Sequence, residues 1–329
     1  MATLVSYDLN GKKLSFANWI SNLSPTETPF VSMTGKEAIN QTLFQWQTDT
    51  LEQASDKNAV VEGSAAVDET RKSTVVLKNI TQILRKVVKV SDTANVLANY
   101  GRGKELQYQM EKAGKEIKRD LEVTLLQNGK QADESGEDEA RTGRKTAGFS
   151  ALVGGGVAKE DGKPEDPDTD TGAIVVIKAK EAGKIAEADI FDLTYNLYLA
   201  GSNANIIMFH PAHAKFFSSL METNASGQNR MRMFDGAKDT RFNVYVSTVV
   251  DPLGQEYKLI PNRWMPKDKV YVFTPSDWTQ MVLRAPERTK LAKDGSYEKW
   301  MIEMEVGLRH RNPYASGILE VGEAANGKG

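Results

Sequence analysis

One long helical pattern, over residues 101–127, limits most strongly how this chain can fold. Apolar residues recur along one face at the three- and four-residue spacing of an amphipathic helix. They are Leu106, Met110, Ala113, Ile117 and Leu121. Asn128-Gly129 ends the pattern. At ~1.5 Å per residue the predicted helix is about 40 Å long. A helix of that length is unusual in a chain of 329 residues.

Two predicted strands precede this helix and flank a polar stretch. Residues 42–50 alternate, with Phe44 and Trp46 on one side, which predicts a half-buried strand. The apolar residues of 74–90 also fit a helical face, but their β-branched content favours a strand. The polar residues 51–73 between the strands predict a long projecting hairpin, because loops of that length inside compact domains are uncommon without a role.

The remaining parts of the chain differ in composition and predicted structure. Residues 1–40, which include Trp19, predict an extended or loosely helical arm, because prolines interrupt any long helix. Residues 130–170 carry 11 acidic and 6 basic residues and predict a surface loop with one short buried piece, 149–153. The remainder predicts a compact α/β unit with helices over 188–200 and 212–221. Its strands are expected over 206–209, 242–248, 257–260, 270–273 and 300–308, the last with Glu305 and Gly307 on the outward face.

Composition excludes several classes of protein. The 42 Lys and Arg residues against 44 Asp and Glu give a net charge of −2, which excludes a global polycation that binds nucleic acid. Cysteine is absent, so disulfides, thiolate nucleophiles and cysteine zinc sites are excluded. The start lacks a secretory signal pattern, and no window approaches 18 consecutive apolar residues. We therefore expect a protein that stays in a cytoplasm-like compartment and does not enter a membrane.

The candidate catalytic chemistry is weak. His210 and His213 lie three residues apart and could share a metal, but the remaining histidine, His310, follows about 100 residues later. A metal site needs three or more ligands, so a helix-capping and surface role is favoured. Gly154-Gly155-Gly156 lacks the Lys and Ser or Thr of a phosphate loop, and no nucleophile elbow occurs. We expect no cofactor and no metal; a metal-dependent α/β hydrolase using both histidines is the alternative.

Two stretches have the composition of contact surfaces. Residues 71–90 carry six basic residues and no acidic one, which fits either a solvated strand face or an electrostatic contact with an acidic neighbour. They include Arg71, Lys72, Arg85 and Lys86. The segment Arg230-Met231-Arg232-Met233-Phe234 combines adaptable methionines with arginine and an aromatic ring, which fits an interface or an ordinary loop.

The order of these parts resembles that of tailed-phage major capsid proteins with the Hong Kong 97-type fold. Thr28-Pro29-Phe30, Phe44-Gln45-Trp46 with Asp49, Glu62-Gly63, Ile80-Thr81-Gln82-Ile83 and the closing Asn312-Pro313-Tyr314-Ala315 are similar to podovirus-like major head proteins. The resemblance covers almost the whole chain. It implies an α+β fold with an N-arm, a β-hairpin called the E-loop, a peripheral (P) domain with a long spine helix, and an α/β axial (A) domain.

The resemblance also implies boundaries and partners. The N-arm would be 1–40, the E-loop 41–90, the P domain 91–129 and 296–329, and the A domain 130–295. Copies would form hexamers and pentamers of an icosahedral head that encloses double-stranded DNA, assembled in the bacterial host cytoplasm. The E-loop would lie on a neighbouring subunit, with a separate scaffolding protein, a portal and a decoration protein as further partners. Another virion protein, such as a tail-tube or decoration protein, fits the composition but not the long helix.

Trp19, Phe30 and Trp46 join the basic and methionine-rich residues as candidate contacts between subunits. The full set is Trp19, Phe30, Trp46, Arg71, Lys72, Arg85, Lys86, Arg230, Met231, Arg232, Met233 and Phe234.

Overall fold

The predicted long helix is present as α3, Glu105–Gln127, and its apolar stripe is buried from Met110 onward, with Leu106 half-buried. Met110, Ala113, Ile117 and Leu121 are all less than 7% exposed. The structure is a computed structural model. It describes residues 27–49, 51, 56–66, 73–97, 104–136, 142–154, 175–219 and 247–322.

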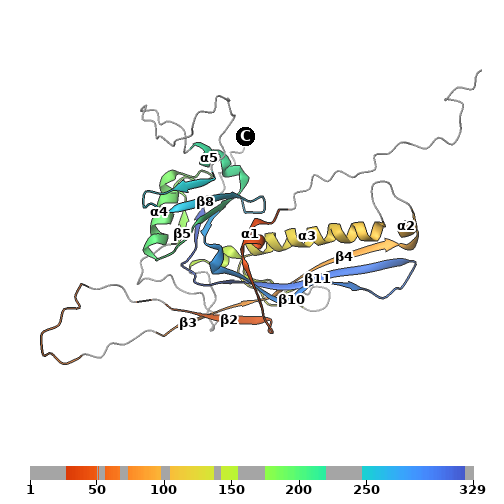
Figure 1. The fold of residues 1–329 in the computed structure, drawn as a ribbon, viewed down its shortest axis with the longest axis horizontal. Helices are drawn as coiled ribbons and strands as arrows, with labels where there is room; N and C mark the ends of the chain where they lie inside the picture. The colour runs from red at the N-terminus through yellow and green to blue at the C-terminus, as the bar shows by residue number, and fades with distance from the viewer. Residues whose placement is uncertain are drawn as a thin grey trace, which may run out of the picture. The chain divides into compact units, whose positions relative to one another are not determined.

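The chain divides into two compact units that share long elements. Unit 1 contains Arg85–Ile117 and Glu287–Glu303, and unit 2 contains Thr28–Leu84, Lys118–Pro286 and the chain from Met304 onward. A four-stranded sheet has the strand order β1-β10-β11-β4 (Figure 1). Three of these strands and α3 continue from one unit into the other. The strands are β1, Gly35–Ala38; β4, Gln82–Ser91; β10, Trp278–Lys290; and β11, Tyr297–His310.

The predicted hairpin is formed by β2, Leu43–Thr48, and β3, Val75–Ile80, which pair antiparallel. Phe44 is buried and Trp46 half-buried on the same face, as the alternation predicted. The single strand expected over 74–90 is wrong, because the chain leaves the hairpin after β3 and enters the four-stranded sheet as β4. The break falls at the fully buried Thr81, whose hydroxyl donates a hydrogen bond to Glu305.

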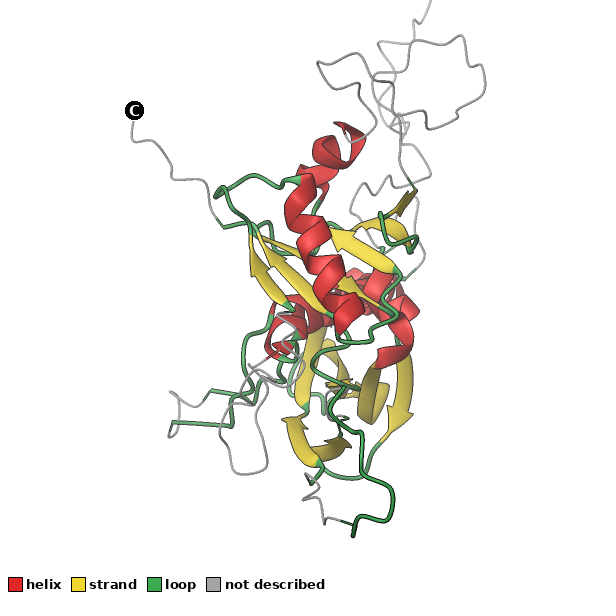
Figure 2. Ribbon diagram, turned by 90° about the vertical axis from the view of Figure 1, so that its left-hand side faces the viewer, coloured by secondary structure: helices red, strands yellow, loops and turns green. Residues whose placement is uncertain are grey.

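A six-stranded mixed sheet forms most of the rest of unit 2, with the order β5-β12-β9-β6-β8-β7. Helix α4, Glu187–Leu199, packs against β5 and β12 (Figure 1). Figure 2 is viewed from the side of α4 and shows helices (red) over strands (yellow). The strands are β5, Val176–Lys178; β6, Ile206–Phe209; β7, Thr248–Val250; β8, Glu256–Pro261; β9, Lys269–Phe273; and β12, Gly317–Glu320.

Short helices connect these elements. The expected helix over 212–221 is divided, because Pro211 opens a tight 3₁₀ turn, η5, that precedes α5. Only the last residue of the strand expected over 242–248 is in β7, and residues 242–246 lie outside the described residues. The connecting helices are α1, Pro29–Met33; α2, Asp92–Val96; η3, Phe149–Ala151; η5, Pro211–His213; α5, Ala214–Ser219; and η6, Pro275–Asp277.

Strand β11 corrects a second expectation. It is 14 residues long, and its second half is covered on both faces. Glu305 is 3% exposed and Gly307 is also buried, although the alternation placed both toward solvent. A Cβ on Gly307 would lie 2.5 Å from the ring of Phe44, so glycine allows the hairpin to pack directly on this strand.

Aromatic side chains form the centre of the core of unit 2. The ring of Phe149 stacks on Tyr271 with centroids 4.1 Å apart and on Trp278 at 4.2 Å. The expectation that 149–153 is a buried piece of an otherwise polar region is confirmed, because Phe149 and Leu152 are both at most 1% exposed.

Candidate interaction surfaces

The connection between β2 and β3 exposes aliphatic side chains. Leu51 is 92% exposed, and Val60 and Val61 are 83% and 78% exposed. Residues 56–66 are exposed throughout and lie beyond the paired strands (Figure 1). A turn fixes this part: Ser64 N–H donates to Val61 C=O at 3.0 Å, and Gly63 adopts φ 78°. Exposed large aliphatic residues on one loop are typical of a surface that another protein covers.

A buried carboxylate holds the base of the hairpin. Glu305 accepts hydrogen bonds from the Thr81 hydroxyl at 2.7 Å, from Arg144 at 2.5 Å and from Arg284 at 3.0 Å. Arg144 Nε also donates to Thr81 C=O at 3.3 Å. The break between β3 and β4 is therefore tied to β11 and β10 through one side chain.

Asn79, on β3, is fully buried and uses both ends of its amide. Its Oδ1 accepts the backbone N–H groups of Ile80 at 2.8 Å and Ala147 at 2.9 Å. Its Nδ2 donates to Leu308 C=O at 2.6 Å. The sequence analysis missed Asn79 and Glu305. An amide within a β-branched run was the available signal for Asn79, whereas nothing in the alternation of β11 distinguishes Glu305 from Glu303.

Phe30 lies in the core of its own chain. It is fully buried, and its ring meets those of Phe273 at 5.6 Å, Trp278 at 5.8 Å and Phe149 at 5.9 Å. The structure thus places Phe30 in the interior of unit 2 and not on an exposed surface. Trp19, the other aromatic candidate of the arm, lies outside the described residues.

Glu122, on α3, fixes the backbone around Phe30. Its carboxylate accepts Phe30 N–H at 2.9 Å and Val31 N–H at 2.8 Å, and Asn262 Nδ2 donates to it at 2.7 Å. Burial raises the pKa of Glu122 above its ordinary value, and the three donors offset part of this rise by stabilising the charged form. This arrangement anchors α1 to the spine helix.

The basic candidates have different surroundings. Arg85 pairs with Glu303 of its own unit at 2.6 Å, although its side chain is 55% exposed. Lys89 lies over the ring of Tyr297, 3.6 Å from its centroid. Part of the positive charge of β4 is therefore matched within unit 1. Arg71, Lys72 and the segment 230–234 lie outside the described residues.

The histidines form no shared site in the described part of the chain. His210 Nδ1 accepts Ala212 N–H at 3.1 Å and so caps η5, while His213 Nε2 donates to Lys267 C=O at 2.7 Å. Across the described ranges, no three His, Asp or Glu side chains converge as metal ligands. The helix-capping role favoured for His210 is confirmed.

His310 has a role in the core. It stacks on Trp278 with centroids 4.0 Å apart, and its Nδ1 donates to Leu152 C=O at 3.0 Å. Its Nε2 accepts from the Ser316 hydroxyl at 2.9 Å. Complete burial lowers the pKa of His310 to about 4, so the ring is neutral at pH 7.

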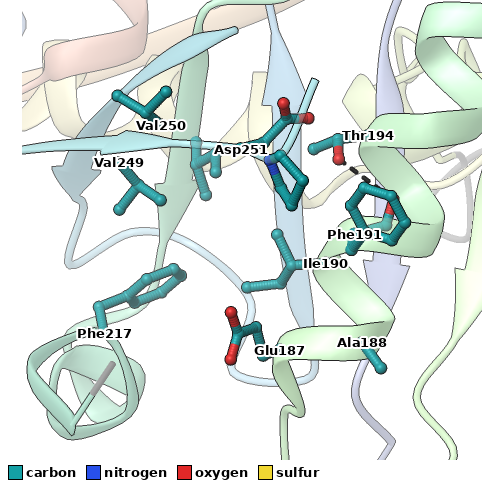
Figure 3. Close-up of a pocket in the computed structure, with 11 residues that line it drawn as sticks. Glu187, Ala188, Ile190, Phe191, Thr194, Phe217, Val249, Val250 and Asp251 are labelled. Atoms are coloured by element: carbon teal, nitrogen blue, oxygen red, sulfur yellow. Dashed lines mark hydrogen bonds between the residues drawn. The ribbon is translucent and has the colours of Figure 1, made fainter. Parts of the chain in front are cut away.

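An apolar pocket of about 470 Å³ lies between α4, β7, β6 and α5 (Figure 3). Ile190, Phe191, Ile207, Phe217 and Val249 provide most of its apolar lining. Glu187 and Asp251 bring carboxylates to it. We call this the α4–β7 pocket.

No helix within the described residues is both long enough and apolar enough to cross a membrane.

Known proteins are similar to this chain in sequence and in fold. A family model of the SU10 major capsid protein matches residues 3–322. The chain belongs to the SU10 major capsid protein family. It is 59% identical to the major capsid protein of Escherichia phage Phieco32, over 96% of each chain.

Solved structures extend the likeness to the fold. The capsid protein of a native GTA particle superposes with a TM-score of 0.63 at 14% identity, covering 97% of each chain. A chain from Microbacterium phage Oxtober96 superposes with a TM-score of 0.60 at 12% identity, covering 98% of this chain and 100% of that one. The SrpI encapsulin of Synechococcus elongatus PCC 7942 superposes with a TM-score of 0.55 at 12% identity, covering 97% of this chain and 94% of that one.

These likenesses confirm the expected Hong Kong 97-type α+β fold and the expected role. The protein is a phage major capsid protein, a structural component of the virion that self-assembles into the capsid lattice. The family assignment gives no support to the alternative of a metal-dependent hydrolase. It also replaces the alternatives of a tail-tube or decoration protein.

Proposed function

We propose that the hexamers and pentamers of this capsid are joined by the loop between β2 and β3, which lies on a neighbouring subunit. The observation that carries the proposal is the exposure of Leu51, Val60 and Val61, which the described residues of their own chain leave largely uncovered. Burying such side chains against a neighbour contributes ~25 cal/mol per Å² of apolar surface. Arg71 and Lys72, at the return of the same loop, add an electrostatic contact with an acidic surface.

The closed shell encloses double-stranded DNA, which the inner surface contacts without sequence specificity, and the chain has no catalytic role. A scaffolding protein, a portal and a decoration protein are the further partners. Assembly takes place in the host cytoplasm. In this scheme 1–40 is the N-arm, 41–90 the E-loop, 91–129 with 296–329 the P domain, and 130–295 the A domain.

The test replaces Val60 and Val61 with serine in the full chain. We expect unchanged circular dichroism, because neither side chain is buried, and loss of shells in electron micrographs. Asn58→Ser, a polar exchange in the same loop, is the matched control and should form normal shells. Normal shells from the double serine variant would refute the proposed contact.

A second variant tests the charge. Arg71→Glu combined with Lys72→Glu should impair shell formation and leave the monomer folded. Normal assembly by this variant would remove the electrostatic part of the proposal and leave the aliphatic part in place.

A further inference from the structure

The α4–β7 pocket contains a carboxylate oxygen without a donor. Asp251 Oδ1 accepts the N–H of Leu253 at 2.6 Å and so closes the turn between β7 and β8. Its Oδ2 is buried and has no hydrogen-bond partner among the described residues. A buried carboxylate oxygen without a donor is destabilising, and a cationic donor from a ligand would satisfy it.

The apolar surface of the pocket continues beyond its rim. Val250 is 54% exposed and Leu253 is 39% exposed on one side. On the other side the ring of Phe191 meets that of Tyr195 at 6.3 Å, and Tyr195 is 44% exposed. Apolar side chains exposed next to an apolar pocket mark a surface for protein contact. The ligand that fits is a peptide segment with large apolar side chains and a cation.

The chain contains such a segment. We propose that the α4–β7 pocket of one subunit binds Arg230-Met231-Arg232-Met233-Phe234 of a second copy. Flexible methionine side chains fill irregular apolar pockets well. A guanidinium from the same segment supplies the donor that Asp251 Oδ2 lacks, with Glu187 adding negative charge. Within this chain, the predicted interface segment and the pocket are therefore complementary in both apolar character and charge.

The segment has enough flanking chain to reach beyond its own subunit. It lies near the middle of residues 220–246, with ten residues between Ser219 and Arg230 and twelve between Phe234 and Ser247. Ten residues can span up to ~35 Å. The inference rests on the proposed function, because assembly is what brings a second copy to this pocket.

The absence of native cysteine allows a direct test. One full-length chain carries Val250→Cys and a second, of different size through an added tag, carries Met233→Cys. The two are co-assembled, oxidised and separated on a non-reducing gel. A disulfide forms only where the two Cα atoms come within about 7 Å. Lys258→Cys, exposed on β8 and outside the pocket, replaces Val250→Cys in the control mixture.

We expect a mixed dimer band from the Val250→Cys and Met233→Cys pair and none above background from the control pair. Shells that show no such band overturn the pocket contact but leave the capsid contacts of the β2–β3 loop in place. A single chain that carries both cysteines and closes only an intramolecular disulfide would also overturn it, because the segment would then occupy its own pocket. Failure of the unmodified chain to assemble would instead refute the proposed function.

A charge variant gives a readout independent of thiols. Asp251→Asn retains Oδ1 for the turn and removes the charge, so the subunit should fold normally. We expect roughly tenfold less shell at limiting protein concentration. Glu256→Gln, an exposed carboxylate outside the pocket, is the control and should leave the yield unchanged. An unchanged yield for Asp251→Asn overturns the predicted pairing with arginine.

Discussion

Replacing Phe30 with alanine tests whether the N-terminal segment of the capsid protein is anchored as the structure indicates. The side chain is fully buried, and three rings surround it at centroid distances between 5.6 and 5.9 Å. Phe→Ala in a well-packed core costs ~3–5 kcal/mol of unfolding free energy. The value should fall in the upper half of this range, because the hydrogen bonds of Glu122 to the local backbone limit collapse of the cavity.

The measurement is guanidinium unfolding of the unassembled subunit, followed by tryptophan fluorescence, since Trp278 is one of the rings that contact Phe30. Phe30→Leu retains most of the apolar volume and should cost no more than about 1.5 kcal/mol. Tyr198→Ala, at a position that is 53% exposed, is the control and should change stability by about 0.5 kcal/mol or less. If Phe30→Ala matched this control, residues 29–33 would not be packed in the core, and the anchoring argument would fail.

Three further substitutions or conditions test the core. Gly307→Ala should lower the free energy of unfolding by ~1–3 kcal/mol, because its Cβ would lie 2.5 Å from the Phe44 ring. Gly114→Ala, at a position on α3 with open space around it, should raise the free energy of unfolding by up to about 1 kcal/mol. Thermal melts of the two variants, measured side by side, test both values. The pKa of His310 is lowered from 6.5 to about 4, so the unfolded chain binds its proton first as pH falls. The contribution of neutral His310 to the free energy of unfolding is therefore complete above pH 6.5 and should fall by about 3 kcal/mol between pH 6.5 and pH 4. This fall should be smaller in a His310→Gln variant. Glu305→Ala removes the carboxylate that Arg144 and Arg284 both contact and should cost ~1–3 kcal/mol in a urea titration, a range discounted for the partial exposure of the two arginines. No loss of stability would show that the carboxylate does not fix the hairpin base.

Periodicity alone predicted the elements whose burial is one-sided. The stripe of α3 and the alternation of β2 both follow from residues that face one core. The whole-chain order of these elements was specific enough to indicate the capsid fold. What failed were positions where two layers enclose the same strand. Gly307 and Glu305 read as outward-facing because alternation cannot show that a second layer covers that side.

The polar residues missed from the sequence share one physical role. Asn79, Glu122 and Glu305 are buried side chains, and each binds at least one group that lies more than 60 residues away in the chain, such as the backbone N–H groups of Phe30 and Ala147. Such pairs are set by tertiary placement, so no local pattern encodes them. Each also lies where a segment leaves the core: Glu122 at α1, and Asn79 and Glu305 at the base of the hairpin. A buried polar group destabilises the fold unless its hydrogen-bond partners are in place. These three residues therefore favour one arrangement of the backbone where α1 and the hairpin leave the core. The described part of the loop beyond the hairpin exposes aliphatic residues instead. A subunit built this way fixes where its contact segments begin and leaves their outer parts to be covered by a neighbour.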